Sequence, residues 1–325
     1  MGHFWMECGA IPVKIKKAFK KKTSQGGELK VKTAMSSWEK VLFSTQEWRS
    51  FWRSKLCQVI LWFYYKKVLR GEWVLYLDNG TRFIYHADSG FLPLSFSFSG
   101  ITDFREMRFL SRYLRKGDVV FDCGAHQGLY SVYLAKLVGE EGRVIAIEPS
   151  QKFLFYLQKN AVANGLRCIE IYPFAAGNKK ETKLFYENGP FSRLAPPSLE
   201  GCSTEVEVRP LEEILKPTSR YAFGKIDVEG AELFVLQGLD RMLKEGNPPV
   251  LQLEITKLVK DYGYSPHKLQ EFLEDRGYFI YLYSPWSNRL LACSHHGSNC
   301  INFLAIHKEG KKFVLERLNS QRKNT

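Results

Sequence analysis

The sequence predicts an α/β fold with a doubly wound, mostly parallel sheet that carries one antiparallel strand. Between residues 119 and 276, short apolar runs alternate with segments whose apolar residues recur at helical spacing. Two apolar runs, 279–283 and 301–306, then follow each other near the end of the chain. Alternating strands and helices build a parallel sheet, and the closing strand pair adds an antiparallel strand at its end.

The elements are expected in this order. Residues 73–98 form a hairpin-like lead-in, because residues 73–86 alternate in polarity around Asp78-Asn79-Gly80, a typical two-residue turn. Residues 104–114 have helical spacing, and residues 182–215 are less regular. The alternating part has strands at 119–123, 144–148, 168–172, 223–228 and 250–254, and helices at 129–138, 151–163, 232–243 and 267–276.

A basic, Trp-rich extension, residues 1–72, precedes the main domain, residues 73–325. Residues 1–70 hold 15 Lys and Arg against four Glu, and six of the seven Trp lie at or before Trp73. From Ser36 onward its apolar residues recur at helical spacing. The alternatives are a helix whose aromatic face packs on the main domain, a helix lying on a membrane surface, and contact with nucleic acid.

The net charge of +13 belongs to the two ends of the chain. The basic tail, residues 308–325, has six basic against two acidic residues, which leaves residues 71–307 at −2. A nucleic acid is therefore not expected as a partner of the main domain. The seven cysteines form no C-x-x-C pair, which indicates a reducing compartment and no zinc site. We expect a cytoplasmic protein, with contact of residues 1–70 to a membrane surface as one of the alternatives above.

A glycine-punctuated turn between a strand and a helix is the first candidate site. The first strand of the alternating part leads into Gly124-x-x-x-Gly128, and the second ends at Glu148, where an acid accepts hydrogen bonds from a ribose diol. A dinucleotide-binding turn needs a glycine, with no side chain beside the pyrophosphate, at the position that His126 occupies in this chain. The spacing therefore disfavours NAD and favours S-adenosylmethionine. The alternatives are glycines that only make a tight turn, and Glu148 as a surface acid before Pro149.

A second constellation lies at the end of the predicted strand 223–228. Lys225-Ile226-Asp227-Val228-Glu229-Gly230-Ala231-Glu232 places three carboxylates within six residues. The macrodipole of a following helix explains acids in its first turn, which accounts for Glu229 and Glu232 without a function. Asp227 ends a strand at the edge where open α/β sheets bind ligands, and Glu254 ends the next strand.

These segments together resemble the FkbM family of S-adenosylmethionine-dependent methyltransferases, over residues 99–256. The pieces that carry the resemblance stand in the family's order and are Gly100 with Glu106, the segment 116–128, Ile147-Glu148-Pro149, the helix end 160–165, Ala175-Ala176-Gly177, the segment 225–232 and Glu254. The string 225–232 is the most specific of them. The family commonly has Asn where this chain has His126, and this departure leaves the expected Rossmann-like class I methyltransferase sheet intact.

The resemblance implies roles for individual residues. Asp122, Gly124 and Gly128 line the methionine end of the cofactor, Glu148 meets the ribose, and the backbone at Ala176 serves the adenine. The expected cofactor-binding set is Asp122, Gly124, His126, Gly128, Tyr130, Ser131, Glu148 and Ala176.

The implied reaction is O-methylation of a hydroxyl on a sugar or another small natural product. Such a transfer needs a base for the hydroxyl proton, and the candidates are Asp227 and Glu229, with Glu254 behind them. Asp227 and Glu254 also suit a divalent cation, but the sequence shows no third ligand, and we expect no metal. The contrasting interpretation is a catalytically degenerate methyltransferase-fold binding module, tethered by its basic N-terminus to membrane or nucleic acid.

Overall fold

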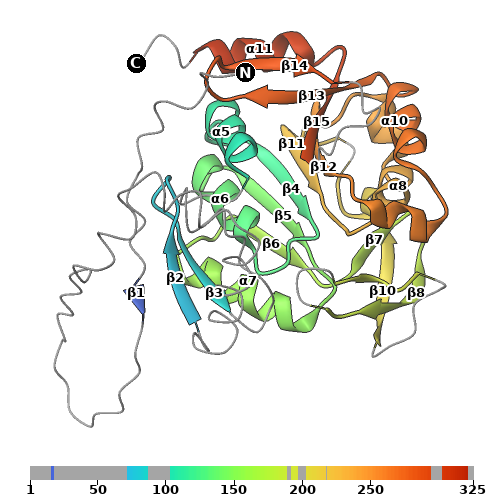
Figure 1. Cartoon of the computed structure of the whole chain (residues 1–325). Coiled ribbons are helices and arrows are strands. Elements are labelled where there is room, and N and C mark those ends of the chain that lie inside the picture. The colour runs from blue at the N-terminus through green and yellow to red at the C-terminus, as the bar shows by residue number, and fades with distance from the viewer. Residues whose placement is uncertain are drawn as a thin grey trace, which may run out of the picture.

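The computed structural model describes residues 16–17, 72–86, 103–188, 192–196, 203–216, 218–293 and 302–320. The helix expected from Ser36 and the part of the lead-in beyond residue 86 lie outside these residues, so the division at residue 72 stays a prediction. No helix in these ranges is long and apolar enough to cross a bilayer. Figure 1 shows the described elements arranged around one large sheet.

The large sheet has the strand order β14-β13-β15-β12-β11-β4-β5-β6. The neighbours from β12 to β6 pair in parallel, which confirms the predicted α/β class. From β4 the chain adds β5 and β6 on one side, and it then adds β11 and β12 on the other side. The strand order therefore reverses between β4 and β11, and ligands bind at such a switch point in open α/β sheets. The parallel strands are β4 (Val119–Cys123), β5 (Arg143–Ile147), β6 (Ile169–Tyr172), β11 (Phe223–Ile226) and β12 (Val250–Glu254).

Helices cover both faces of this sheet (Figure 1). One core lies between the sheet and α5, α6 and α11, and the other lies beneath α8, α9 and α10. The helices are α5 (Phe104–Tyr113), α6 (Leu129–Val138), α7 (Gln151–Ala163), α8 (Glu232–Gln237), α9 (Asp240–Lys244), α10 (Pro266–Glu274) and α11 (Lys311–Ser320), with 3₁₀ turns η3 (Leu211–Glu213) and η4 (Lys257–Tyr262).

The predicted helix 232–243 is two helices, because Gly238 ends α8. A Cβ atom at Gly238 would lie 2.0 Å from the backbone oxygen of Gly177. The two backbones therefore touch at this point, and the continuous helix that the apolar spacing predicts does not form.

The antiparallel end of the sheet contains the predicted strand and one more. β15 (Asn302–His307) lies antiparallel between β12 and β13 (Tyr278–Ser284). β14 (Arg289–Ala292) falls in a stretch that the sequence leaves as a connection, and it pairs with β13 as a hairpin.

The less regular residues 182–215 contribute to a second sheet with the order β7-β10-β8-β9. Its strands are β7 (Ala175–Gly177), β8 (Glu181–Tyr186), β9 (Arg193–Leu194) and β10 (Ser203–Pro210). This small sheet lies beyond the carboxyl ends of the central strands in Figure 1. It is therefore placed to wall a site at that edge.

The predicted hairpin is present as β2 (Glu72–Tyr76) and β3 (Arg82–His86), and β2 also pairs with β1 (Lys16–Lys17). Asn160 of α7 binds the outer strand: its side chain accepts from the Ile84 N–H at 2.6 Å and donates to the Ile84 oxygen at 3.1 Å. The same amide donates to the backbone oxygen of Gln127 at 3.0 Å. One buried Asn thus ties the hairpin to the glycine turn.

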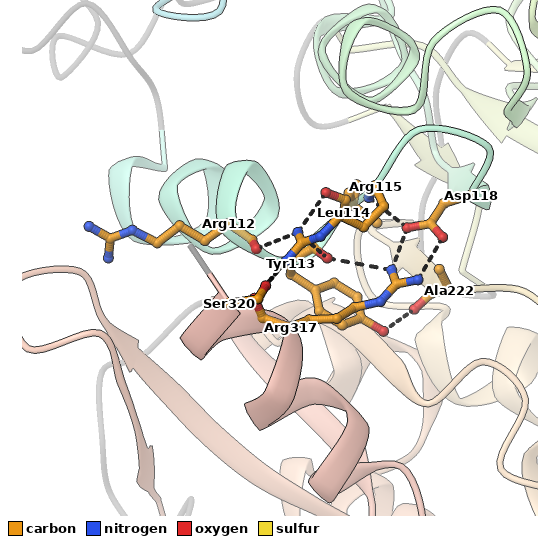
Figure 2. A network of polar contacts seen from close by, with 8 residues as sticks. All are labelled: Arg112, Tyr113, Leu114, Arg115, Asp118, Ala222, Arg317 and Ser320. Atoms are coloured by element: carbon orange, nitrogen blue, oxygen red, sulfur yellow. Dashed lines mark hydrogen bonds and ion pairs between the residues drawn. The ribbon is translucent and has the colours of Figure 1, made fainter. Parts of the chain in front are cut away.

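Helix α11 is fixed to the opposite end of the sheet, away from the glycine turn. Arg317 donates to both oxygens of Asp118, at 2.5 and 3.0 Å, and its guanidinium lies over the Tyr113 ring (Figure 2). Arg115 donates to the backbone oxygen of Arg317 at 2.6 Å and to Ser320 at 2.7 Å. This network anchors the residues that lead into β4.

Candidate functional site

The glycine turn after β4 is held against two neighbouring strands. Gly124 has φ +82°, and a Cβ atom there would lie 1.8 Å from the backbone oxygen of Asp227. The N–H groups of Gly124 and Ala125 both donate to the Ile147 oxygen at 3.0 Å. Only glycine fits at Gly124, because its backbone touches the segment after β11.

Gly128 serves helix packing. It has φ +84° at the start of α6, and a Cβ atom there would lie 2.8 Å from the Leu157 side chain of α7. Gly128 does not line the cavity described below. Gly128 therefore lies at the contact between α6 and α7.

His126 and Glu148 are joined at the front of the turn. The His126 N–H donates to one oxygen of Glu148 at 2.8 Å, and the Ser150 N–H donates to the other at 2.9 Å. The His126 ring lies 3.8 Å, centroid to centroid, from the ring of Phe153. Burial raises the pKa of Glu148 to about 7, against the two hydrogen bonds that favour its ionised form.

A cavity of about 250 Å³ opens where the turn, the ends of β5 and β11, and the small sheet meet. A single water needs only about 10–15 Å³ by such a measure, so the cavity suits a molecule of many atoms. It is lined by Cys123, Gly124, His126, Ile147, Glu148, Pro149, Phe153, Phe174, Ala175, Ala176, Phe185, Ser192, Arg193, Leu194, Asp227, Val228 and Glu229.

Two acids of the cavity lining, Asp227 and Glu229, form a cluster with a third acid, Glu254. Asp227, Glu229 and Glu254 each have an oxygen within 4.8 Å of the other two. The Lys225 ammonium donates to Asp227 at 2.6 Å. The structure thus brings together the three predicted catalytic residues, and Glu229 has φ +55° at the turn that presents it.

The environments of the three acids differ. Burial raises the pKa of Asp227, but the Lys225 ammonium and a hydrogen bond from Glu254 outweigh it and hold the pKa below its ordinary value. Burial and the Asp227 charge raise the pKa of Glu254. Burial, with the Asp227 and Glu232 charges, raises the pKa of Glu229 to about 8. Near neutral pH the cluster therefore holds one negative charge, on Asp227.

The cluster also bears on the metal alternative. The structure supplies Glu229 as the third oxygen ligand that the sequence did not show, so Asp227, Glu229 and Glu254 together could hold a cation. Asp227 is at the same time paired with the Lys225 ammonium. The expectation of no metal stays a prediction.

A buried polar row lies beneath the acids, on the face of the sheet toward α5 and α6. Lys225 stands opposite Asp122 on β4 and Gln252 on β12. Asp122 accepts from the Ser131 hydroxyl at 2.6 Å, and its pKa is raised by burial. Asp122 therefore lies next to Lys225 on the neighbouring strand and is bound by Ser131, and neither residue lines the cavity.

Tyr130 extends this row toward α5. Its hydroxyl donates to Asp103 at 2.8 Å and accepts from Gln252 at 2.9 Å, and the Lys225 ammonium lies 4.5 Å from its ring centre. Tyr130 is buried and, like Asp122, lies outside the cavity lining. Asp103 and Gln252 were not predicted as part of the site. For Gln252 the signal was a polar residue in the otherwise apolar run Val250-Leu251-Gln252-Leu253.

Gly124, His126, Glu148 and Ala176 do line the cavity, as expected for a nucleoside-binding site. Glu148 adds a carboxylic acid to the lining, and Phe153, Phe174 and Ala176 add apolar residues. This donor set fits a ribose and a purine ring. In the glycine turn, the N–H groups of Gly124 and His126 already donate to the Ile147 oxygen and to Glu148, so they are not available to a diphosphate.

Comparison with known proteins agrees with the sequence resemblance. Residues 122–280 match the profile of the methyltransferase FkbM domain. This match confirms the predicted family and, with it, S-adenosylmethionine as the cofactor. A 23S rRNA (uracil(1939)-C(5))-methyltransferase, RlmD, of Acinetobacter baylyi is 32% identical over 91 residues, which are 27% of this chain and 20% of that protein.

Solved structures with a similar backbone include methyltransferases of several kinds. Methyltransferase FkbM from Methylobacillus flagellatus is 21% identical with a TM-score of 0.39, over 58% of this chain and 43% of that one. A SAM-dependent methyltransferase from Aquifex aeolicus is 18% identical with a TM-score of 0.38, over 66% and 92%. These scores are low, so the fold assignment rests on the strand order described above.

Proposed function

The chain carries a methyltransferase FkbM domain over residues 122–280, and on this premise we propose that it methylates a hydroxyl group of a small-molecule acceptor. One observation carries the proposal. A single cavity has Glu148 at one part of its wall and the ionised Asp227 at another. A nucleoside-binding acid and a base thus face the same bound molecules.

Glu148 and the apolar wall hold the cofactor in this proposal. The Glu148 carboxylate accepts from the ribose diol, and the adenine lies against Phe153, Phe174 and the backbone at Ala176. When bound, S-adenosylmethionine supplies a methyl group already activated by its positively charged sulfur. The protein therefore needs to align the acceptor, which is worth about 7–11 kcal/mol in well-oriented systems, and to take up one proton.

Asp227 takes up that proton. It stays ionised near neutral pH because Lys225 donates to it at 2.6 Å. Glu254 donates a hydrogen bond to Asp227 and is held protonated by burial, so it orients the base without competing for the hydroxyl proton. Glu229 adds a neutral carboxyl group at the cavity wall, suited to hydrogen bonding a polar acceptor such as a sugar.

An oxygen acceptor is supported over the carbon acceptor named for the curated relative. Methylation at C5 of a uracil needs a nucleophile that first activates the ring, and a thiolate is the usual choice. Cys123 is the cysteine among the described cavity residues. Burial and the Asp122 charge raise the pKa of the Cys123 thiol well above its ordinary value, so it is a poor nucleophile.

The test is a screen of hydroxylated acceptors for release of S-adenosylhomocysteine. Asp227→Asn should abolish release with any acceptor found, while Glu271→Gln, at an exposed position of α10, should leave it unchanged. S-adenosylhomocysteine should bind in calorimetry with micromolar affinity, and Glu148→Ala should weaken it. Absence of binding at millimolar ligand, or full activity of Asp227→Asn, would contradict the proposal.

A further inference from the structure

Arg193 has no role in the function proposed so far, although it lines the cavity. It lies on β9, where Arg193 pairs with Tyr186 of β8. The Tyr262 hydroxyl donates to the backbone oxygen of the next residue, Leu194, at 2.5 Å. The Arg193 Nη2 lies 3.0 Å from an oxygen of Asp261. The backbone and one edge of the guanidinium are thus fixed from two sides.

The other edge of the guanidinium is unsatisfied. The Arg193 side chain is only 11% exposed. Its Nη1 is buried and has no hydrogen-bond partner in the described part of the chain. Buried donors are nearly always satisfied, and one left unpaired costs free energy. Because this nitrogen lies beside a cavity, we expect a ligand in the cavity to supply the missing hydrogen-bond acceptor.

The charges around the cavity indicate which kind of hydrogen-bond acceptor a ligand would present to Arg193. Among the described side chains that line it, Arg193 carries the permanent positive charge, and Glu148, Asp227 and Glu229 are acids. Lys225 is already engaged with Asp227. A negatively charged group of a ligand would be repelled by the ionised Asp227 and attracted at Arg193. The planar fork of the guanidinium matches two oxygens of a carboxylate or phosphate.

We propose that Arg193 binds an oxyanion, a carboxylate or phosphate group, on a molecule held in this cavity. The proposal rests on the proposed function, since it concerns ligands of the same site. Two sources carry this chemistry. One is the α-carboxylate of the methionine part of the cofactor, whose α-ammonium group would suit the surrounding acids. The other is an acid group on the methyl acceptor.

Calorimetry with two nucleosides separates the sources. S-adenosylhomocysteine carries the α-carboxylate, and 5′-methylthioadenosine lacks the amino-acid part. If the cofactor is the source, Arg193→Gln lowers the affinity for S-adenosylhomocysteine by about 10- to 100-fold, the effect of one charge-assisted hydrogen bond. The same variant then binds 5′-methylthioadenosine as the wild type does, and Arg193→Lys, which keeps the charge but loses the fork, is intermediate.

If the acceptor is the source, Arg193→Gln binds both nucleosides normally. Inorganic phosphate, titrated into the protein saturated with S-adenosylhomocysteine, then binds the wild type and not the variant. Arg241→Gln removes one charge from a side chain that is 59% exposed and should behave as wild type in every titration. Thermal unfolding of both variants checks that the fold is kept.

The proposal is overturned if Arg193→Gln matches the wild type with both nucleosides and phosphate binds neither protein, or binds both equally. Failure of both nucleosides to bind the wild type would instead overturn the proposed function. In that case phosphate titrated into the ligand-free protein and into Arg193→Gln still decides whether Arg193 holds an oxyanion.

Discussion

Gly124→Ala tests whether the glycine turn is fixed by its contact with the segment after β11. Gly124 and Gly117 both have φ +82°, a conformation that side chains disfavour. A Cβ atom at Gly117 would meet nothing within 4 Å, whereas one at Gly124 would lie 1.8 Å from the Asp227 oxygen. The two substitutions therefore share the backbone strain and differ only in the steric clash.

The expected magnitudes follow from this comparison. Left-handed strain costs an Ala about 1–2 kcal/mol at either position. At Gly124 the Asp227 carbonyl must also move by more than an ångström, since ordinary contacts begin at 3.4 Å. Overpacking of this kind costs about 1–3 kcal/mol more. We expect Gly124→Ala to lose about 2–5 kcal/mol of unfolding free energy, and Gly117→Ala about 1–2 kcal/mol.

Urea denaturation of the two variants without cofactor measures both losses. The absence of cofactor matters, because a glycine kept only for close approach of a ligand would show no extra cost in the free protein. Equal losses for Gly124→Ala and Gly117→Ala would show that the contact with Asp227 does not constrain the turn, and would leave the glycine a ligand-binding role alone. A larger loss at Gly124 would place the constraint in the protein itself.

Three further predictions concern the charged residues. Lys225→Met leaves Asp122 and Asp227 without their cation and should cost about 3 kcal/mol in urea denaturation; adding Asp227→Asn should recover part of it, and no recovery would contradict the pairing. Burial raises the pKa of Glu148 to about 7. The fraction of ionised Glu148, the form that accepts hydrogen bonds from a ribose, therefore increases as the pH rises. The affinity for S-adenosylhomocysteine should therefore increase from about pH 6 to about pH 8, and Glu148→Gln should flatten this dependence; an unchanged slope would refute the role of Glu148. Arg317→Ala should cost about 2 kcal/mol in thermal or urea unfolding without changing cofactor affinity, since Arg317 anchors α11 at the opposite end of the sheet.

The parts of the site that could be predicted follow from local sequence and one rule of topology. An acid after an apolar strand lies at the carboxyl edge of a parallel sheet, where ligands bind. This rule placed Glu148, Asp227 and Glu254 correctly along one edge. The glycine spacing likewise placed Gly124 in the turn. These inferences needed only the order of strands and helices.

The residues that could not be placed depend on register and on tertiary packing. Gly128 has the backbone expected of a ligand-binding glycine, yet its open side faces Leu157 of another helix. Asp122 and Gln252 flank Lys225 only because three strands align at one register. No local pattern states that register.

Arg193 could not be predicted for a different reason. It belongs to a two-residue strand within a stretch that has neither helical nor alternating periodicity. Its place over the cavity comes from pairing with β8 and from the Tyr262 hydroxyl bound to its neighbour Leu194. Such a segment is positioned entirely by partners that are distant in the sequence.

The acidic string after β11 shows how the fold separates residues that look equivalent in the sequence. Asp227 and Glu229 are two residues apart, but it is Asp227 that accepts a hydrogen bond from the Lys225 ammonium. Together with the hydrogen bond from Glu254, this ammonium outweighs burial and lowers the pKa of Asp227. Glu229 follows in a turn with φ +55°, and burial with the Asp227 and Glu232 charges raises its pKa to about 8. Neighbouring acids whose pKa values are pushed apart can divide the work of base and proton-bearing partner. In the proposed function, the lysine on β11 therefore favours Asp227 over Glu229 as the base.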